Sequence, residues 1–131
     1  MEIENIALNN GVVRLPLSLG MEWVVDARQC STTALRDVAT IDGVIAQILS
    51  MASLVPVSAP IVHRLPEGGI AMIVLLAEAH LAIHTFPARG AATLNLYSAH
   101  TPTDLDWRSA LGSWLGAREV HVRRLARGEF S

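Results

Sequence analysis

LLAEAHLAIHTFPARG, residues 75–90, is an apolar segment that contains four polar side chains: Glu78, His80, His84 and Thr85. A carboxylate, two imidazoles and a hydroxyl this close together are typical of proton-transfer chemistry. Ala79, which separates the acid from the first imidazole, has a methyl side chain that can take no part in such chemistry. The segment is therefore a candidate site for proton-transfer chemistry in which Ala79 itself takes no part.

The same segment belongs to a run of four short β-like stretches. They are APIVHRL (59–65), GIAMIVLLA (69–77), HLAIHTF (80–86) and AATLNLYSA (91–99). Proline and glycine separate these stretches at 66–69 and 87–90, and a tight bend is expected near Glu78. Further strands are predicted at 21–27 and, from its clean alternation, at 119–125.

Two amphipathic helices are predicted outside this run. From Ile41 onward apolar residues recur at helical spacing, with Thr40 as the expected N-cap. A second helix is expected from about Thr103, with Asp106 completing its capping box. Its buried stripe consists of Trp107, Leu111, Trp114 and Leu115. Consecutive strands with short links favour an antiparallel sheet, and two helices can cover one of its faces. We therefore expect an α+β fold, a two-layer sandwich whose other sheet face is paired with another chain.

Length and composition limit the architecture. A chain of 131 residues fits a single domain, in which residues 1–19 are expected to form a peripheral N-terminal arm. The chain is 51% hydrophobic and 17% charged, which favours a surface partly covered by a partner. No apolar run reaches the roughly 18 residues of a membrane span, and the first residues lack the pattern of a signal peptide. A cytoplasmic location follows as an expectation.

Charge and residue usage exclude several kinds of site. The net charge is −2, and the small basic cluster of Arg123, Arg124 and Arg127 is interpreted as a solvated strand face, so nucleic acid is not an expected partner. All ten basic residues are arginine, which excludes an imine on a lysine, including a lysine-linked pyridoxal phosphate. Cys30 is the single cysteine, which excludes an internal disulfide and a multi-cysteine metal site. We interpret it as a small buried hydrophobe.

The motif EAHLAIHTFP at 78–87 resembles the signature of the bacterial and archaeal S-adenosylmethionine decarboxylases, in which Glu-Ser-His is followed by a short apolar stretch and His-Thr-Trp-Pro. Three other stretches are similar to that family's Gly-rich turn and strand, first strand and last strand: PEGGIAMIVLLAEAH, GMEWVVDARQC and REVHVRRLARG. The resemblance runs from Gly20 to Gly128 in one register. It implies that residues 1–131 form one domain of the S-adenosylmethionine decarboxylase type.

Members of this family work through a pyruvoyl group made from their own chain. The resemblance implies that a serine attacks the carbonyl of the preceding glutamate, after which chain cleavage leaves a pyruvoyl cap. The ketone forms an imine with S-adenosylmethionine and accepts electrons as carbon dioxide leaves. Ala79 stands at the position of that serine and offers neither nucleophile nor leaving group. We therefore expect no pyruvoyl group and no cleavage.

Other positions also depart from the family's pattern. By resemblance, Ala71 stands at the position of a processing serine and Ala99 at that of the proton-donating cysteine. Ala88 replaces a glutamate that holds the substrate, and Leu65 replaces an aromatic residue that stacks on the adenine. Glu22 replaces a histidine of the first strand. Those that keep matching chemistry are Glu78, His84 and Phe86, the last in place of tryptophan. Losses at so many positions favour natural divergence over a laboratory substitution at Ala79 alone.

Each candidate residue also has a structural interpretation. By family role His84 would be the processing base, but without a serine a buried, hydrogen-bonded imidazole is favoured. His80 and His84 are four residues apart, which on a strand separates them by roughly 13 Å. No metal site is therefore expected, because His63 or His100 would join them only through an unpredicted fold-back. Glu78 is interpreted as a solvated turn residue.

Three functions are compatible with these residues. The first is a pseudoenzyme linked to polyamine (spermidine) synthesis, acting as a homodimer or as the partner of an active homologue. The second is a repurposed, cofactor-free enzyme that binds S-adenosylmethionine or a related amino compound and uses acid–base chemistry through Glu78, His84 or Glu22, for example in a specialised biosynthetic pathway. The third is a ligand sensor. The residues expected to line a retained ligand pocket are Leu65, Glu78, His80, His84 and Phe86.

Overall fold

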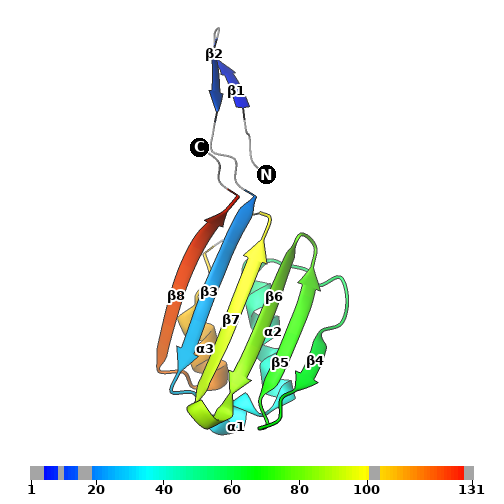
Figure 1. Cartoon of the computed structure of the whole chain (residues 1–131), viewed down its shortest axis with the longest axis vertical. Helices are drawn as coiled ribbons and strands as arrows, with labels where there is room; N and C mark the ends of the chain where they lie inside the picture. The colour runs from blue at the N-terminus through cyan, green and yellow to red at the C-terminus, as the bar shows by residue number, and fades with distance from the viewer. Residues whose placement is uncertain (1–4, 9–10, 15–18, 101–103, 129–131) are drawn as a thin grey trace.

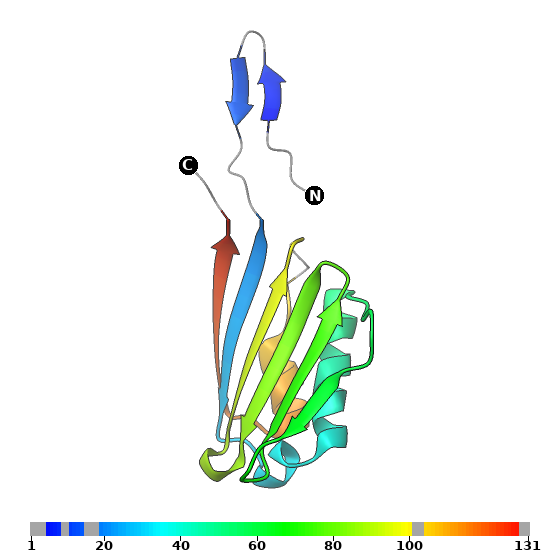
Figure 2. The ribbon, with the colours of Figure 1, turned by 45° about the vertical axis from the view of Figure 1, so that its right-hand side comes forward.

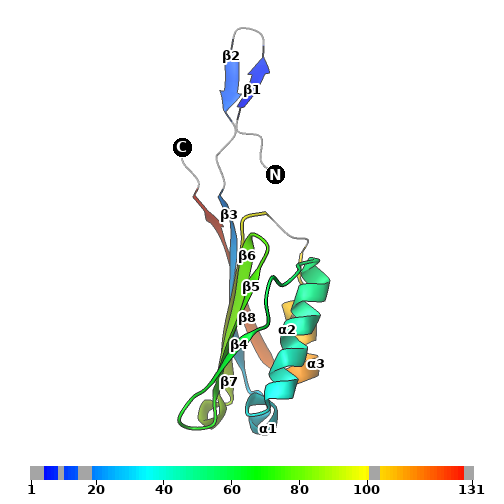
Figure 3. The same cartoon turned by 90° about the vertical axis from the view of Figure 1, so that its right-hand side faces the viewer.

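A six-stranded antiparallel sheet in the order β4-β5-β6-β7-β3-β8 is the main feature of the structure (Figure 1). The structure is a computed structural model that describes residues 5–8, 11–14, 19–100 and 104–128. The six strands are β3 (Gly20–Arg28), β4 (Ile61–Arg64), β5 (Ile70–Leu76), β6 (Ala79–Phe86), β7 (Ala91–Ser98) and β8 (Glu119–Arg127). Helices α2 (Val38–Ala52) and α3 (Trp107–Leu115) both lie on one face of the sheet (Figure 3). The predicted two-layer α+β sandwich is confirmed.

Smaller elements complete the described part of the chain. A one-turn helix α1 (Thr32–Leu35) precedes α2, and a 3₁₀ turn η1 (Pro87–Arg89) joins β6 to β7. Strands β1 (Asn5–Leu8) and β2 (Gly11–Arg14) pair with each other as a separate two-stranded sheet within the predicted N-terminal arm (Figure 2). Leu19 donates its N–H to the carbonyl of Arg127, so the chain joins the main sheet one residue before β3.

Both helix starts differ from those predicted. Helix α2 begins at Val38 because Asp37 is its N-cap: the carboxylate accepts hydrogen bonds from the N–H and the hydroxyl of Thr40, at 3.1 and 2.6 Å. The assignment of Thr40 as N-cap was therefore wrong. Helix α3 begins at Trp107, with Asp106 itself as the N-cap that accepts from the N–H of Ser109. The predicted start at Thr103 lies outside the described residues.

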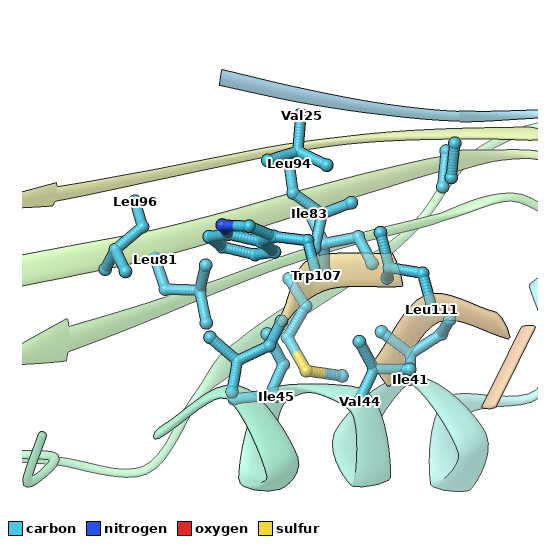
Figure 4. Close-up of a cluster of buried hydrophobic side chains, with 14 of the residues drawn as sticks. Val25, Ile41, Val44, Ile45, Leu81, Ile83, Leu94, Leu96, Trp107 and Leu111 are labelled. Atoms are coloured by element: carbon cyan, nitrogen blue, oxygen red, sulfur yellow. The ribbon is translucent and has the colours of Figure 1, made fainter. Parts of the chain in front are cut away.

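The core lies between the helices and alternate side chains of the central strands (Figure 4). Leu81, Ile83, Leu94 and Leu96 project from the sheet toward Ile41, Val44, Trp107 and Leu111 of the helices. Trp107, Leu111 and Leu115 are buried as predicted. Trp114 was expected in the same stripe, but it is 40% exposed because its ring lies against Gly43 at the edge of the α2–α3 contact.

The sheet face opposite the helices, called here the open face, has no helix over it in the described structure (Figure 3). Its large apolar side chains that remain exposed are Ile61, Ile73, Leu75, Phe86 and Leu125. The basic cluster predicted as one strand face on β8 is divided between the two faces: Arg123 and Arg127 lie on the open face, whereas Arg124, opposite the buried Trp23, lies on the face that the helices cover. The side chains of Arg123, Arg124 and Arg127 are about half exposed or more, and each lies near a carboxylate: Asp26, Asp104 and Glu22, respectively.

Candidate functional site

The β5–β6 hairpin turn places Glu78 and Ala79 at one end of the sheet. Leu76 pairs with Ala79, so the turn consists of two residues, and Glu78 adopts a left-handed backbone with φ of 62°. The carbonyl of Glu78 accepts a hydrogen bond from the N–H of Ala99, at 2.8 Å, which fixes the turn against the end of β7. Ala79 is buried, with 6% of its surface exposed, and it pairs with Ser98.

A carboxylate–imidazole pair lies beside these alanines. The Oε2 atom of Glu78 is 2.7 Å from Nε2 of His100, and both side chains are exposed. The buried hydroxyl of Ser98 donates to the carbonyl of His100 and accepts from its N–H, which holds the backbone of the histidine in place. We call Glu78, Ala79, Ala99 and His100 the turn cluster. An imidazole oriented by a carboxylate is a common arrangement for proton transfer.

His100 was not among the residues predicted for this cluster. Glu78 is solvent-exposed as expected, but it is also paired rather than free. The missing signal was the register of the sheet: in an antiparallel β5–β6–β7 meander, the turn before β6 lies next to the end of β7. Antiparallel pairing of β5, β6 and β7 would have placed Glu78 beside Ala99 and His100.

Histidines of two other strands share a row on the open face. His63 of β4 and His84 of β6 both lie opposite Ala71 of β5. The expectation of a buried His84 was wrong, because the ring projects from the face that no helix covers and is exposed in the single chain. His63 joins this row through ordinary strand pairing, so the predicted need for a fold-back was wrong. Within the described residues, no group of three or more His, Cys, Asp or Glu side chains is placed to hold a metal ion.

A cavity of about 330 Å³ lies at the opposite end of β6. It is called here the Phe86 pocket, and its lining residues are Leu65, Pro66, Glu67, Gly69, Thr85, Phe86, Pro87, Ala88 and Arg89. Two of the residues predicted to line a ligand pocket, Leu65 and Phe86, therefore meet in one cavity, together with Ala88 at the position that the resemblance assigns to substrate holding. Glu78 and His80 do not reach it, because Ala79 and Phe86 are seven positions apart on β6, or roughly 23 Å. In a single chain the predicted site is divided between the two ends of the sheet.

Glu22 lies at the same end of the sheet as the turn cluster, on the open face. Its two carboxylate oxygens are both engaged: Oε2 accepts from Nδ2 of Asn95 at 3.1 Å, and Oε1 accepts from Nη1 of Arg127 at 2.5 Å. Both oxygens of the Glu22 carboxylate therefore already accept hydrogen bonds in the folded chain, and a ligand proton would compete with Asn95 and Arg127 for them. The structure therefore argues against Glu22 as an acid–base catalyst.

Cys30 follows β3 and is buried, as predicted. Burial raises the pKa of its thiol because the thiolate would lose hydration. The thiol therefore stays protonated near neutral pH, and its role is that of an apolar side chain in the core.

Comparison with known proteins identifies the family. The sequence profile of S-adenosylmethionine decarboxylase matches residues 21–128, nearly the whole sheet-and-helix body. The chain belongs to the S-adenosylmethionine decarboxylase family. An S-adenosylmethionine decarboxylase proenzyme from Thermotoga petrophila is 30% identical over 115 residues, which cover 86% of this chain and 87% of that protein.

Shorter matches and a solved structure agree with this assignment. The proenzyme from Pyrobaculum neutrophilum is 31% identical over 75 residues, and the match spans 57% of this chain but only 60% of the relative. The crystal structure of the adenosylmethionine decarboxylase from Aquifex aeolicus has a TM-score of 0.71 and 22% identity, covering 87% of this chain and 94% of the other. At that identity the likeness shows a shared fold.

The residues present do not fit the pyruvoyl group that the family resemblance implies. Such a group grows from a side chain with an oxygen on Cβ, and at this position Ala79 supplies a buried methyl within a paired hairpin.

Proposed function

We propose that this chain is an S-adenosylmethionine decarboxylase homologue that does not process itself and acts as a regulatory or structural partner in polyamine (spermidine) biosynthesis. The observation that carries the proposal is Ala79, directly after the left-handed Glu78, where self-processing needs a hydroxyl. The chain also has no lysine, so it cannot replace a pyruvoyl carbonyl with a lysine-linked pyridoxal phosphate.

The division of the site supports a partner role. The turn cluster and the Phe86 pocket lie at opposite ends of β6, and the open face between them carries exposed apolar side chains such as Ile73 and Leu75. A second chain packed open face to open face, about a two-fold axis that runs between the sheets and perpendicular to the strands, would bring the turn cluster of one chain toward the Phe86 pocket of the other. The second chain would be a copy of this protein or an active homologue.

Intact mass under denaturing conditions tests the absence of processing. We expect one species at the full-length mass of 14.1 kDa, whereas an active family member treated in parallel gives two fragments. Two fragments from this chain that sum to its mass, within one water, would contradict the proposal.

The partner role has a separate test. Adding this chain to an active family member from the same genome is expected to change the rate of carbon dioxide release from carboxyl-labelled S-adenosylmethionine, and the two chains are expected to co-elute. The same addition of heat-unfolded chain is the control. No co-elution together with no change in rate would contradict a regulatory role.

A second function is favoured by one observation, the Glu78–His100 pair in the turn cluster. It would make the chain a cofactor-free enzyme that binds S-adenosylmethionine or a related amino compound and acts on it by proton transfer. Under this alternative the wild-type chain alone converts S-adenosylmethionine to a product of changed mass, and His100→Gln abolishes that conversion. Binding of S-adenosylmethionine without any conversion would instead favour a ligand sensor.

A further inference from the structure

A cavity of about 320 Å³ lies on the helix-covered side of the sheet, between β8 and the start of α3. It is called here the Trp107 pocket, and its walls include Trp23, Asp104, Leu105, Trp107, Arg108 and Arg124. Trp23 and Arg124 are cross-strand neighbours, and Trp23 is buried beneath the helices. The pocket is therefore away from the open face, so a second chain packed on that face would leave it accessible. The proposed function makes no use of it.

The indole N–H of Trp107 is a buried donor without an acceptor. Trp107 is 2% exposed, and within the described residues its Nε1 atom has no hydrogen-bond partner. Buried polar groups in folded proteins are almost always hydrogen-bonded, and an unpaired one costs stability. This N–H therefore indicates a place where a further acceptor would bind favourably.

The N–H points along a cross-strand row that continues into the pocket wall. Nε1 lies on the side of the indole that faces Leu81 and Leu96 (Figure 4). Leu96 pairs with Trp23, which in turn pairs with Arg124. The row thus connects the edge of the indole that carries the N–H with the arginine of the pocket.

Two guanidinium groups supply further donors at the pocket. The central carbon of Arg124 lies 5.8 Å from the centre of the Trp23 ring, and Nη2 of Arg108 donates to the carbonyl of Val120 at 3.0 Å. Each of these contacts engages one part of a group that has five N–H donors in a rigid fork. Both arginines therefore keep donors for a ligand.

The pocket also contains two carboxylates, and both are already engaged. Asp106 is the N-cap of α3 and accepts from the N–H of Ser109. Asp104 accepts from Nη1 of Arg124 over 3.4 Å, but its side chain is 93% exposed, compared with 49% for Arg124. A long, exposed ion pair of this kind contributes little to stability. A ligand carboxylate can therefore replace Asp104 at Arg124 with little loss.

We propose that the Trp107 pocket binds a small carboxylate with an apolar body. The carboxylate accepts from the indole N–H of Trp107 and pairs with Arg124 in place of Asp104, while the apolar body lies against Leu105 and Trp23. The buried N–H requires an acceptor, and the guanidinium favours an anionic acceptor over a neutral one because charge-assisted hydrogen bonds are stronger. Apolar walls with a few placed polar groups are typical of small-molecule sites.

Titration of the full chain with benzoate, followed through the indole N–H signals in ¹H–¹⁵N NMR spectra, tests this proposal. The chain has three tryptophans, and variants that replace each by phenylalanine assign their signals. A saturable shift is expected for Trp107 and none for Trp114, which lies against Gly43 at the α2–α3 contact. Benzylamine, with the same ring and a positive charge, is expected to give no shift, and neutral benzamide is expected to bind at least tenfold more weakly.

Two results of this titration would overturn the proposal. A Trp107 signal that does not respond to saturating benzoate would show that water or the chain itself supplies the acceptor. Equal or tighter binding of benzamide or benzylamine would show that the pocket does not select a carboxylate.

Variants of the two charged partners separate an anion site from a cation site. Arg124→Gln is expected to weaken benzoate binding at least tenfold, while the matched control Arg123→Gln, one residue away on the open face, leaves it unchanged. Asp104→Asn removes the competing carboxylate and is expected to tighten binding several-fold, so weaker binding in this variant would overturn the exchange of partners at Arg124. If Arg124→Gln fails to fold, Asp104→Asn, at a highly exposed position, decides alone. Neither intact mass nor co-elution depends on this pocket, so its failure and the failure of the proposed function are distinguishable.

Discussion

At the residue scale, Thr85 of the motif has a structural role that its polar neighbours do not share. It is 1% exposed, and its hydroxyl accepts from the N–H of Ile70 at 2.9 Å and donates to the carbonyl of Leu35 at 2.7 Å. One side chain thus connects β6, β5 and α1. Of the four polar residues in the opening segment, Thr85 stabilises the fold, while Glu78, His80 and His84 project to solvent.

Thr85→Val keeps the shape of the side chain but leaves a buried N–H and a buried carbonyl without their partner. We expect the free energy of unfolding to fall by about 2 to 3 kcal/mol. Thr33→Val, at an exposed position of α1 away from the open face, is the matched control, with an expected change within about 0.5 kcal/mol. Urea denaturation of both variants measures the difference. Equal stabilities would show that the two bonds of Thr85 contribute little.

Ala79→Ser tests whether one hydroxyl restores the family's chemistry. We expect no release of carbon dioxide from carboxyl-labelled S-adenosylmethionine above the wild-type background. The residues resembling the processing and proton-donor positions are still Ala71 and Ala99, and catalytic groups that act as a unit recover little when one is restored. Within one chain, His84 also lies five strand residues from position 79, roughly 16 Å away. Turnover at a rate typical of enzymes would contradict this expectation.

At the element scale, the sequence predicts strands better than helix boundaries. Period-two alternation and Pro/Gly turns located all six strands of the main sheet, because both signals are local. The N-cap of α2 was misplaced because Asp37 and Thr40 are both good caps and only backbone geometry distinguishes them. Trp114 was placed in the core because a helical stripe cannot show where the neighbouring helix ends its contact.

Replacing either of two glycines by alanine is expected to change the stability of the protein in opposite directions. Gly69 precedes β5, and a Cβ there would lie 2.4 Å from the carbonyl oxygen of Thr85, so backbone must move. Gly69→Ala is expected to destabilise the protein by about 2 to 3 kcal/mol. Gly112 is inside α3, where the nearest atom to a new Cβ is 3.7 Å away, and Gly112→Ala is expected to stabilise it by about 0.5 to 1 kcal/mol. Thermal unfolding of both variants tests the pair, and a shift in the same direction for both would contradict it.

At the scale of the whole molecule, residues far apart in sequence meet in ways that local pattern does not encode. The motif resemblance named Glu78, His84 and Phe86, but the structure distributes them from the turn before β6 to the end of that strand. Strand pairing also places His100 beside Glu78 and brings His63 into the cross-strand row of His84. Predicting these pairings needs the strand order β4-β5-β6-β7-β3-β8, in which β3 is inserted between β7 and β8.

Within the described residues, no helix is long and apolar enough to cross a membrane.

The open face yields a prediction about assembly. Exposed Ile73 and Leu75 lie on the same face as Phe86, and a face of this kind favours burial against a second sheet. We expect sedimentation velocity to show a dimer at micromolar concentration, with more than about 1,200 Å² buried in total. Ile73→Glu, which places a charge within that face, is expected to give a monomer. Gln47→Glu adds the same charge on the exposed side of α2 and should leave the dimer intact. A wild-type monomer in the absence of any partner would contradict both the dimer and the open-face argument for a partner role.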